Sequence, residues 1–413
     1  MISRLRTTLG APTLRNFGLD AGSTALYAVF QALISPFILV VAVRRGALAW
    51  EVGLIGAAPN AAMLLSAWYA RLVEGRSLVA WVAVTTALGR ALMLVAAWSR
   101  DMGVYIAAYA ASGLLQAASN PAYTAIERAI YEQRWRGQLM AGVRSVLGLI
   151  QFLATLAAGR LLDRDGTSRV WTAAVAFGLA SSALFSRLRE PPRAAHAASA
   201  AVPARRPGGA LALLREDPRF RALIVAVMFA GGGNLLVSPG YPLYQVHRLH
   251  MTDGGVAALT AVWALAWTIC YPVWGRVCDR RRPAEIVVLA FACYAIPPLC
   301  YAAGAGFHVL LGAYVVQGIG DSALDAGWQN HVMRLAGERT GTYAGAYYTF
   351  LGVRGTAAPL LGALLAARFG LRALFLAGAA SVLCGLVFAR RLPDEPLPAP
   401  VRPAPAAGPA AGA

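Results

Sequence analysis

Residues 275–283 read GRVCDRRRP, a short basic loop between two long apolar runs. The first half of the chain carries a weaker copy in the same setting, ARLVEGR at residues 70–76. Arg71 of the first loop and Arg276 of the second are 205 positions apart, and the same shift superimposes the apolar runs that flank them. A loop that recurs at a fixed distance, together with its flanking runs, indicates a duplicated structural unit.

The composition is that of an integral membrane protein. Of the 413 residues, 58% are hydrophobic and only 14% are charged, with a mean hydropathy of +0.56. A soluble domain carries about 25% charged residues. The five cysteines are odd in number and lie in or beside apolar runs, so no disulfide framework is expected. Residues 1–18 are basic and polar, and we expect the first apolar run to be an uncleaved signal.

Twelve apolar stretches are long enough to cross a bilayer, which requires about 20 residues each. They predict an all-α membrane protein built from two pseudo-symmetric six-helix bundles. The expected spans are 20–43, 50–71, 78–99, 103–126, 138–161, 169–188, 220–243, 255–277, 284–304, 307–328, 341–365 and 371–390. The predicted domains are an N-terminal bundle (1–188), a central loop (189–219), a C-terminal bundle (220–392) and a disordered Pro/Ala-rich tail (393–413).

The arginines predict the orientation of the chain in the membrane. With the N-terminus in the cytoplasm, 25 of the 37 arginines lie on the cytoplasmic side, nine lie outside and three lie within spans. Because basic residues are enriched in cytoplasmic loops, we expect both termini and the central loop to be cytoplasmic, in the inner (plasma) membrane. The same distribution accounts for the net charge of +18 without a nucleic-acid partner.

The basic loops carry a resemblance to the major facilitator superfamily, which extends over about residues 16–391. The second loop is similar to the family's G-x-x-x-D-R-x-G-R-[RK] signature, with Gly275, Asp279 and Arg280 at matching positions and Arg282 in the basic run that follows. In the first loop Arg71, Glu74 and Arg76 correspond, but Ala70 replaces the glycine and Glu74 the aspartate. The resemblance implies alternating access, with these loops holding the cytoplasmic gate closed. Basic loops that only set topology are the alternative.

Polar residues follow one face of each of two equivalent spans. In the tenth span they are Tyr314, Gln317, Asp321, Asp325 and Trp328, and in the fourth they are Tyr109, Ser112, Gln116, Asn120, Tyr123 and Glu127. Ionisable groups at membrane depth face the bundle interior or a wet cavity. The family resemblance implies that the first, fourth, seventh and tenth spans line a central cavity, to which the first and seventh would add Gln31 and Asn234. Alternatively, Asp325 only marks where its helix leaves lipid.

Three arginines lie within spans. Arg354 needs a partner at its depth, and we expect Asp321 on the neighbouring helix to supply it, either as a structural ion pair or as a proton-controlled one. Arg144 is expected to meet Glu127 or an anionic substrate. Arg90 lies on a helix expected to be peripheral, which predicts a structural role.

These features predict a transporter and not an enzyme. No nucleotide-binding loop or nucleophile motif is present, and no cofactor or metal site is predicted. The leading hypothesis is a proton-coupled secondary transporter, a monomer in the lipid bilayer, that exports a small amphipathic or cationic organic solute as an antiporter. The alternatives are uptake or facilitated diffusion of an organic anion or sugar, and a non-transporting receptor on the same scaffold.

Overall fold

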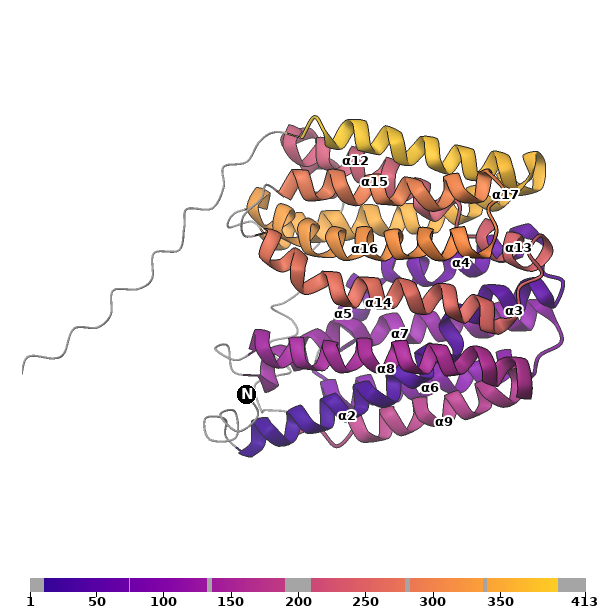
Figure 1. The fold of residues 1–413 in the computed structure, drawn as a ribbon. Coiled ribbons are helices and arrows are strands. Elements are labelled where there is room, and N and C mark those ends of the chain that lie inside the picture. The colour runs from indigo at the N-terminus through magenta and orange to yellow at the C-terminus, as the bar shows by residue number, and fades with distance from the viewer. Residues whose placement is uncertain are drawn as a thin grey trace, which may run out of the picture.

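The computed structural model describes residues 11–73, 75–131, 136–189, 209–278, 283–336 and 340–392. Their regular structure is entirely helical (Figure 1). Helices are the expected solution for a chain in lipid, because an α-helix satisfies its backbone hydrogen bonds internally. The N-terminal half contains α2 (Ala11–Ile34), the 3-10 turn η1 (Ser35–Phe37), α3 (Ile38–Arg44), α4 (Ala49–Leu64), α5 (Ser66–Val73), α6 (Leu78–Trp98), α7 (Met102–Ile130), α8 (Arg136–Asp165) and α9 (Thr167–Phe185).

The C-terminal half repeats this order. It contains α11 (Gly209–Glu216), α12 (Pro218–Leu236), α13 (Gly240–His247), α14 (Asp253–Cys278), α15 (Pro283–Ala302), α16 (Phe307–Ala336) and α17 (Thr340–Ala389). Within α17, Gly370 has φ 81° and ψ 169°, a joint that separates the last two predicted spans. Gly166 (φ 77°) makes the corresponding turn between α8 and α9. Both turns use glycine because a positive φ is strained for other residues.

The predicted spans agree with these helices, two of which are interrupted. The seventh span is interrupted between α12 and α13, at Ser238-Pro239. The first span is likewise interrupted by the turn at Ser35–Phe37, which contains Pro36. Eight stretches of the described residues are long and apolar enough to cross a membrane. Helices α7 and α16 are not among them, because the polar stripes lower their hydropathy.

Contacts between the halves show the pseudo-two-fold symmetry. Helix α4 packs on α17, and α14 packs on α8. A shift of 205 positions moves α4 onto α14 and α8 onto α17, so these two interfaces are equivalent. Both depend on small residues: a Cβ at Gly53 would lie 2.5 Å from that of Ala363, and one at Gly159 would lie 2.6 Å from that of Ala257. Small residues allow two membrane helices to approach closely.

The two ends of the bundle differ. The start of α2 lies at one end, here called the terminal end, whereas α3 and α13 lie at the other (Figure 1). At the α3–α13 end, α3 and α13 are in direct contact. Arg144 of α8 and Asp325 of α16 are exposed, on the terminal-end side of these contacts.

Asp217 caps the first transmembrane helix of the C-terminal half. Its carboxylate accepts the backbone N–H groups of Arg219 (2.8 Å) and Phe220 (3.2 Å), and the Tyr343 hydroxyl donates to it over 2.7 Å. Burial raises the pKa of Asp217, but these hydrogen bonds outweigh burial and place the pKa below its ordinary value. The cap therefore joins the starts of α12 and α17.

Candidate functional site

A cavity of about 280 Å³ lies in the N-terminal half, between α2, α6, α7, α8 and α9, and is called the N-half cavity below. Four of the predicted site residues line it: Gln116, Asn120, Tyr123 and Arg144. The other lining residues are Ser23, Thr24, Tyr27, Val82, Thr86, Arg90, Ser119, Glu127, Val143, Leu147, Ser181 and Phe185. The polar stripe of the fourth span thus faces a cavity, as its periodicity predicts.

A buried carboxyl group contacts the lining of the N-half cavity. Asp20 of α2 is 1% exposed and accepts hydrogen bonds from the hydroxyls of Tyr131 (2.6 Å) and Tyr123 (3.3 Å). Asp20 is not among the predicted site residues, because it stands at the first position of an expected span and looks like a boundary residue. Its spacing from Tyr27, two helical turns later on the same face, is the only local signal for an inward orientation.

Arg144 connects the acidic groups of the two halves. It interacts electrostatically with Asp20 and Glu127 of its own half and with Asp325 of the opposite half. Arg144 and Glu127 line the same cavity. Arg144 and Asp325 are exposed, whereas Asp20 and Glu127 are buried.

The two aspartates of α16 are held by two tryptophans of α14. The indole N–H of Trp263 donates to Asp321 over 2.6 Å, and that of Trp267 donates to Asp325 over 3.1 Å. Both pairs are spaced four residues apart, so the facing helices match turn for turn. The Tyr294 hydroxyl donates to the second oxygen of Asp321. Each oxygen of Asp321 thus accepts a hydrogen bond.

The predicted contact between Arg354 and Asp321 is not made, and that prediction is wrong for this conformation. Instead, Arg354 points to α12, where its NH1 donates to the backbone carbonyl of Val227 over 2.9 Å. Gly231 leaves the room for it, since a Cβ there would collide with the guanidinium. The missing side chain at Gly231 of α12 therefore decides which group Arg354 binds. The depth of the charged residues in the membrane does not.

The remaining predicted site residues are dispersed. Tyr314 accepts a hydrogen bond from the Gln245 amide (3.0 Å). The side chains of Gln31, Asn234 and Gln317 are half-buried on α2, α12 and α16 and do not line the N-half cavity.

Part of the predicted gate motif can be placed. Arg71 is exposed at the end of α5, and the Arg76 guanidinium lies 5.2 Å from the ring centroid of Trp81. Gly275 lies near the end of α14. Glu74, Asp279, Arg280 and Arg282 are outside the described residues.

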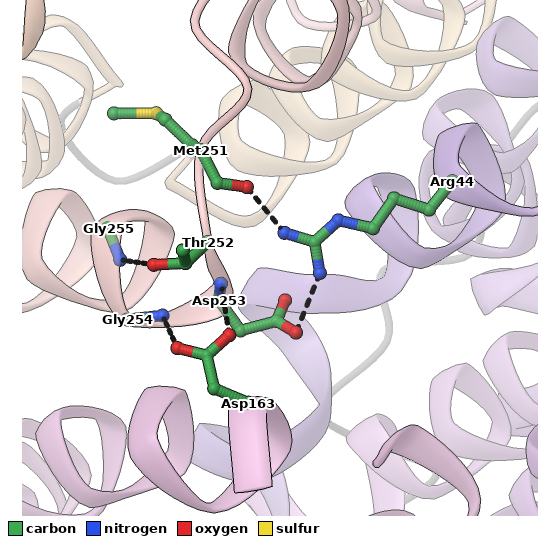
Figure 2. A network of polar contacts seen from close by, with 7 residues as sticks. All are labelled: Arg44, Asp163, Met251, Thr252, Asp253, Gly254 and Gly255. Atoms are coloured by element: carbon green, nitrogen blue, oxygen red, sulfur yellow. Dashed lines mark hydrogen bonds and ion pairs between the residues drawn. The ribbon is translucent and has the colours of Figure 1, made fainter.

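Figure 2 shows a polar contact between the halves at the α3–α13 end. Arg44 at the end of α3 pairs with Asp253 over 2.6 Å and donates to the Met251 carbonyl over 2.7 Å. Asp163 near the end of α8 accepts the first backbone N–H groups of α14, from Asp253 (2.8 Å) and Gly254 (2.9 Å). A carboxylate at a helix N-terminus is favoured by the unpaired N–H groups and the helix dipole. Two residues of the N-terminal half therefore clamp the start of α14.

A family model described as Major Facilitator Superfamily matches residues 21–302 and again residues 224–412. The chain belongs to the major facilitator superfamily. Among curated proteins, none matches the chain significantly. The family assignment makes the protein a multi-pass membrane transporter, which confirms the predicted fold class and the prediction that it is not an enzyme.

Solved structures of transporters share this superfamily fold. A point mutant of the nucleoside transporter NupG has a TM-score of 0.72 at 11% identity, covering 92% of this chain and 99% of that one. A second NupG structure has a TM-score of 0.68 at 11% identity, covering 93% and 98%. A bacterial homologue of the human lysosomal transporter Spinster, solved in an inward-facing and occupied conformation, has a TM-score of 0.68 at 13% identity, covering 91% and 95%.

Proposed function

We propose that this superfamily member is a proton-coupled secondary transporter that exports a small organic solute by alternating access. The supporting observation is that Arg144 is shared between acidic groups of both halves. Attraction between Arg144 and Asp325 holds the halves together at the terminal end, and protonation of Asp325 removes it. Charge changes within a transporter's central cavity are a general means of coupling protons to conformation.

In this mechanism the solute enters from the terminal end, which we assign to the cytoplasm because basic residues are enriched in cytoplasmic loops. It binds between Arg144 and the α16 stripe, with the N-half cavity as part of its site. Opening of the α3–α13 end then requires the clamp of Arg44 and Asp163 on α14 to separate. Protonation from the outer face and release of the solute complete an antiport cycle.

The first experiment is a thermal-stability screen of the purified chain against organic cations, nucleosides, sugars and organic acids, at one acidic and one alkaline pH. Nucleosides are included because NupG, which shares the fold, is a nucleoside transporter. Hits are then tested for transport in proteoliposomes with and without a proton gradient. Arg144→Gln, Asp325→Asn and Asp321→Asn are compared with Asp165→Asn, which changes an exposed aspartate at the α3–α13 end.

The proposal predicts gradient-driven transport in the wild type and in Asp165→Asn, and uncoupled or absent transport in Asp325→Asn and Arg144→Gln. Wild-type transport that ignores the proton gradient would refute the coupling. Accumulation in inside-out vesicles, and not in right-side-out ones, is expected for an exporter.

Uptake or facilitated transport of an organic anion is the second candidate. It is favoured by one observation, that two arginines, Arg90 and Arg144, line the same cavity. Vesicles of the two orientations distinguish the directions.

A further inference from the structure

Arg90 is a buried cation that the proposed mechanism does not use. It is 6% exposed in the middle of α6, and its NH1 donates to the Gly178 carbonyl (2.6 Å) and the Ser182 hydroxyl (2.8 Å). Its Nε–H is buried without a hydrogen-bond partner in the described part of the chain. The helix that carries Arg90 is expected to be peripheral, but the Arg90 side chain points inward and lines the N-half cavity.

The surroundings of the guanidinium contain no counter-charge. It lies 5.0 Å from the ring centroid of Tyr27 and 5.8 Å from that of Phe30, and its fixed contacts are a carbonyl and a hydroxyl. Among the described residues, the ion pairs involve Arg44 and Arg164, not Arg90. A buried arginine without a carboxylate is costly, and such residues in membrane helices usually mark a ligand or ion path.

Arg90 lies at the inner end of the cavity. Gly89 packs against the backbone around Gln116, which places Arg90 at the level of Gln116. Glu127, the buried acid of the lining, follows Gln116 by 11 residues on α7, a rise of about 16 Å towards the terminal end. Arg90 is therefore far from the acid of the lining, whereas the second arginine of the lining, Arg144, interacts with Glu127.

Hydroxyl groups surround the arginine at this inner end. Thr86 and Ser182 share a hydrogen bond of 2.9 Å, and Ser23 and Ser181 share one of 3.3 Å. Hydroxyls of this kind can donate to an anion without competing with its charge. The inner end of the cavity is thus cationic and rich in donors, with Tyr27 providing an aromatic wall.

We propose that the N-half cavity binds an organic acid with its carboxylate against Arg90 and its ring or chain towards the terminal end. Arginine is suited to this role because its guanidinium matches a carboxylate with two parallel hydrogen bonds. A cavity of about 280 Å³ fits a solute of one or two rings. The inference names the substrate class of the proposed transporter and rests on that function only in treating the carboxylate as cargo.

The test is equilibrium binding to the full-length purified protein at constant pH and salt. Benzoate is the probe, benzamide is the uncharged molecule of the same shape, and chloride is the small inorganic anion. The variants are Arg90→Gln, Arg90→Lys and Leu147→Phe, which narrows the cavity without touching Arg90. Arg160→Gln, an exposed arginine of α8, is the matched control.

We expect benzoate to bind to the wild type and to Arg160→Gln, with benzamide and chloride at least about tenfold weaker. Arg90→Gln should weaken the binding of benzoate by about tenfold or more, and Arg90→Lys should weaken it less. Leu147→Phe should also reduce the affinity for benzoate.

Equal binding of benzoate and benzamide, or unchanged benzoate binding to Arg90→Gln, would overturn the proposal. Full competition by chloride would do the same, since it would make this an inorganic-ion site. If Arg90→Gln does not fold, Leu147→Phe decides, and retention of wild-type affinity there counts against the site. Benzoate binding without proton-driven transport would leave the site standing and refute only the proposed function.

Discussion

Replacing Arg44 with glutamine should open the α3–α13 end. In the wild type the guanidinium holds Asp253, whose side chain is only 7% exposed, while its own side chain is 31% exposed. An exposed ion pair contributes at most about 1 kcal/mol, but a hydrogen bond to a charged group with one side buried contributes about 1.5–3 kcal/mol. We therefore expect the closed form to lose about 2 kcal/mol of stability, which raises the ratio of open to closed molecules about thirtyfold.

The measurement is the distance distribution between two spin labels at this end, one at Leu48 in the N-terminal half and one at His308 in the C-terminal half. Both positions are exposed. The labels are placed in a background without native cysteines. Arg44→Gln should increase the long-distance population, whereas Arg164→Gln, which removes an exposed 3.8 Å pair at the same end, should not. Identical distributions in Arg44→Gln and the wild type would refute the reasoning.

Three further predictions concern stability in detergent, measured by thermal unfolding. Gly159→Ala should destabilise the α8–α14 contact by about 1–3 kcal/mol through overpacking, whereas Gly312→Ala, which meets nothing within 4 Å, should have almost no effect; equal losses would contradict the close-packing argument. Trp263→Phe should reduce thermal stability more than Trp267→Phe, because the hydrogen bond of Trp263 is shorter (2.6 against 3.1 Å) and its carboxyl partner is more buried. The reverse order would count against a stabilising role of these bonds. Asp217→Ala should cost about 1 kcal/mol near neutral pH. Folding lowers the pKa of Asp217, so the stabilisation by this cap is present above the ordinary aspartate pKa and is lost as the pH falls through the pKa of the folded protein. The difference in stability between Asp217→Ala and the wild type should therefore shrink in acid. A difference that stays constant with pH would exclude the charged cap.

The spans and their breaks were predictable because hydrophobic length, proline and glycine act locally. Span edges, the gap around Pro239 and the joint at Gly370 all follow from residues within a few positions of the feature. The polar stripes of α7 and α16 were predictable for the same reason, since helical periodicity gathers their residues on one face.

Partners across helices were not predictable. The pairing of Arg354 with Asp321 was inferred from depth alone, but the gap at Gly231 directs the arginine elsewhere, and Trp263 and Tyr294 hold the aspartate. Arg90 was assigned to a peripheral helix, although its side chain points into the N-half cavity. Periodicity identifies the polar face of each helix, and only tertiary packing decides which faces meet.

The clamp on α14 has a consequence for the symmetry of motion. The equivalent interface, α4 on α17, has Leu48 where α14 has Asp253 and Arg368 where α8 has Asp163, under the shift of 205 positions. Among the described residues no ion pair joins that interface, which is packed through Gly53 and Ala363. The stability of the α8–α14 interface is thus sensitive to salt, whereas that of the equivalent α4–α17 interface is not. Raised ionic strength should separate the α8–α14 interface first, so that the two halves rotate apart about the interface between α4 and α17.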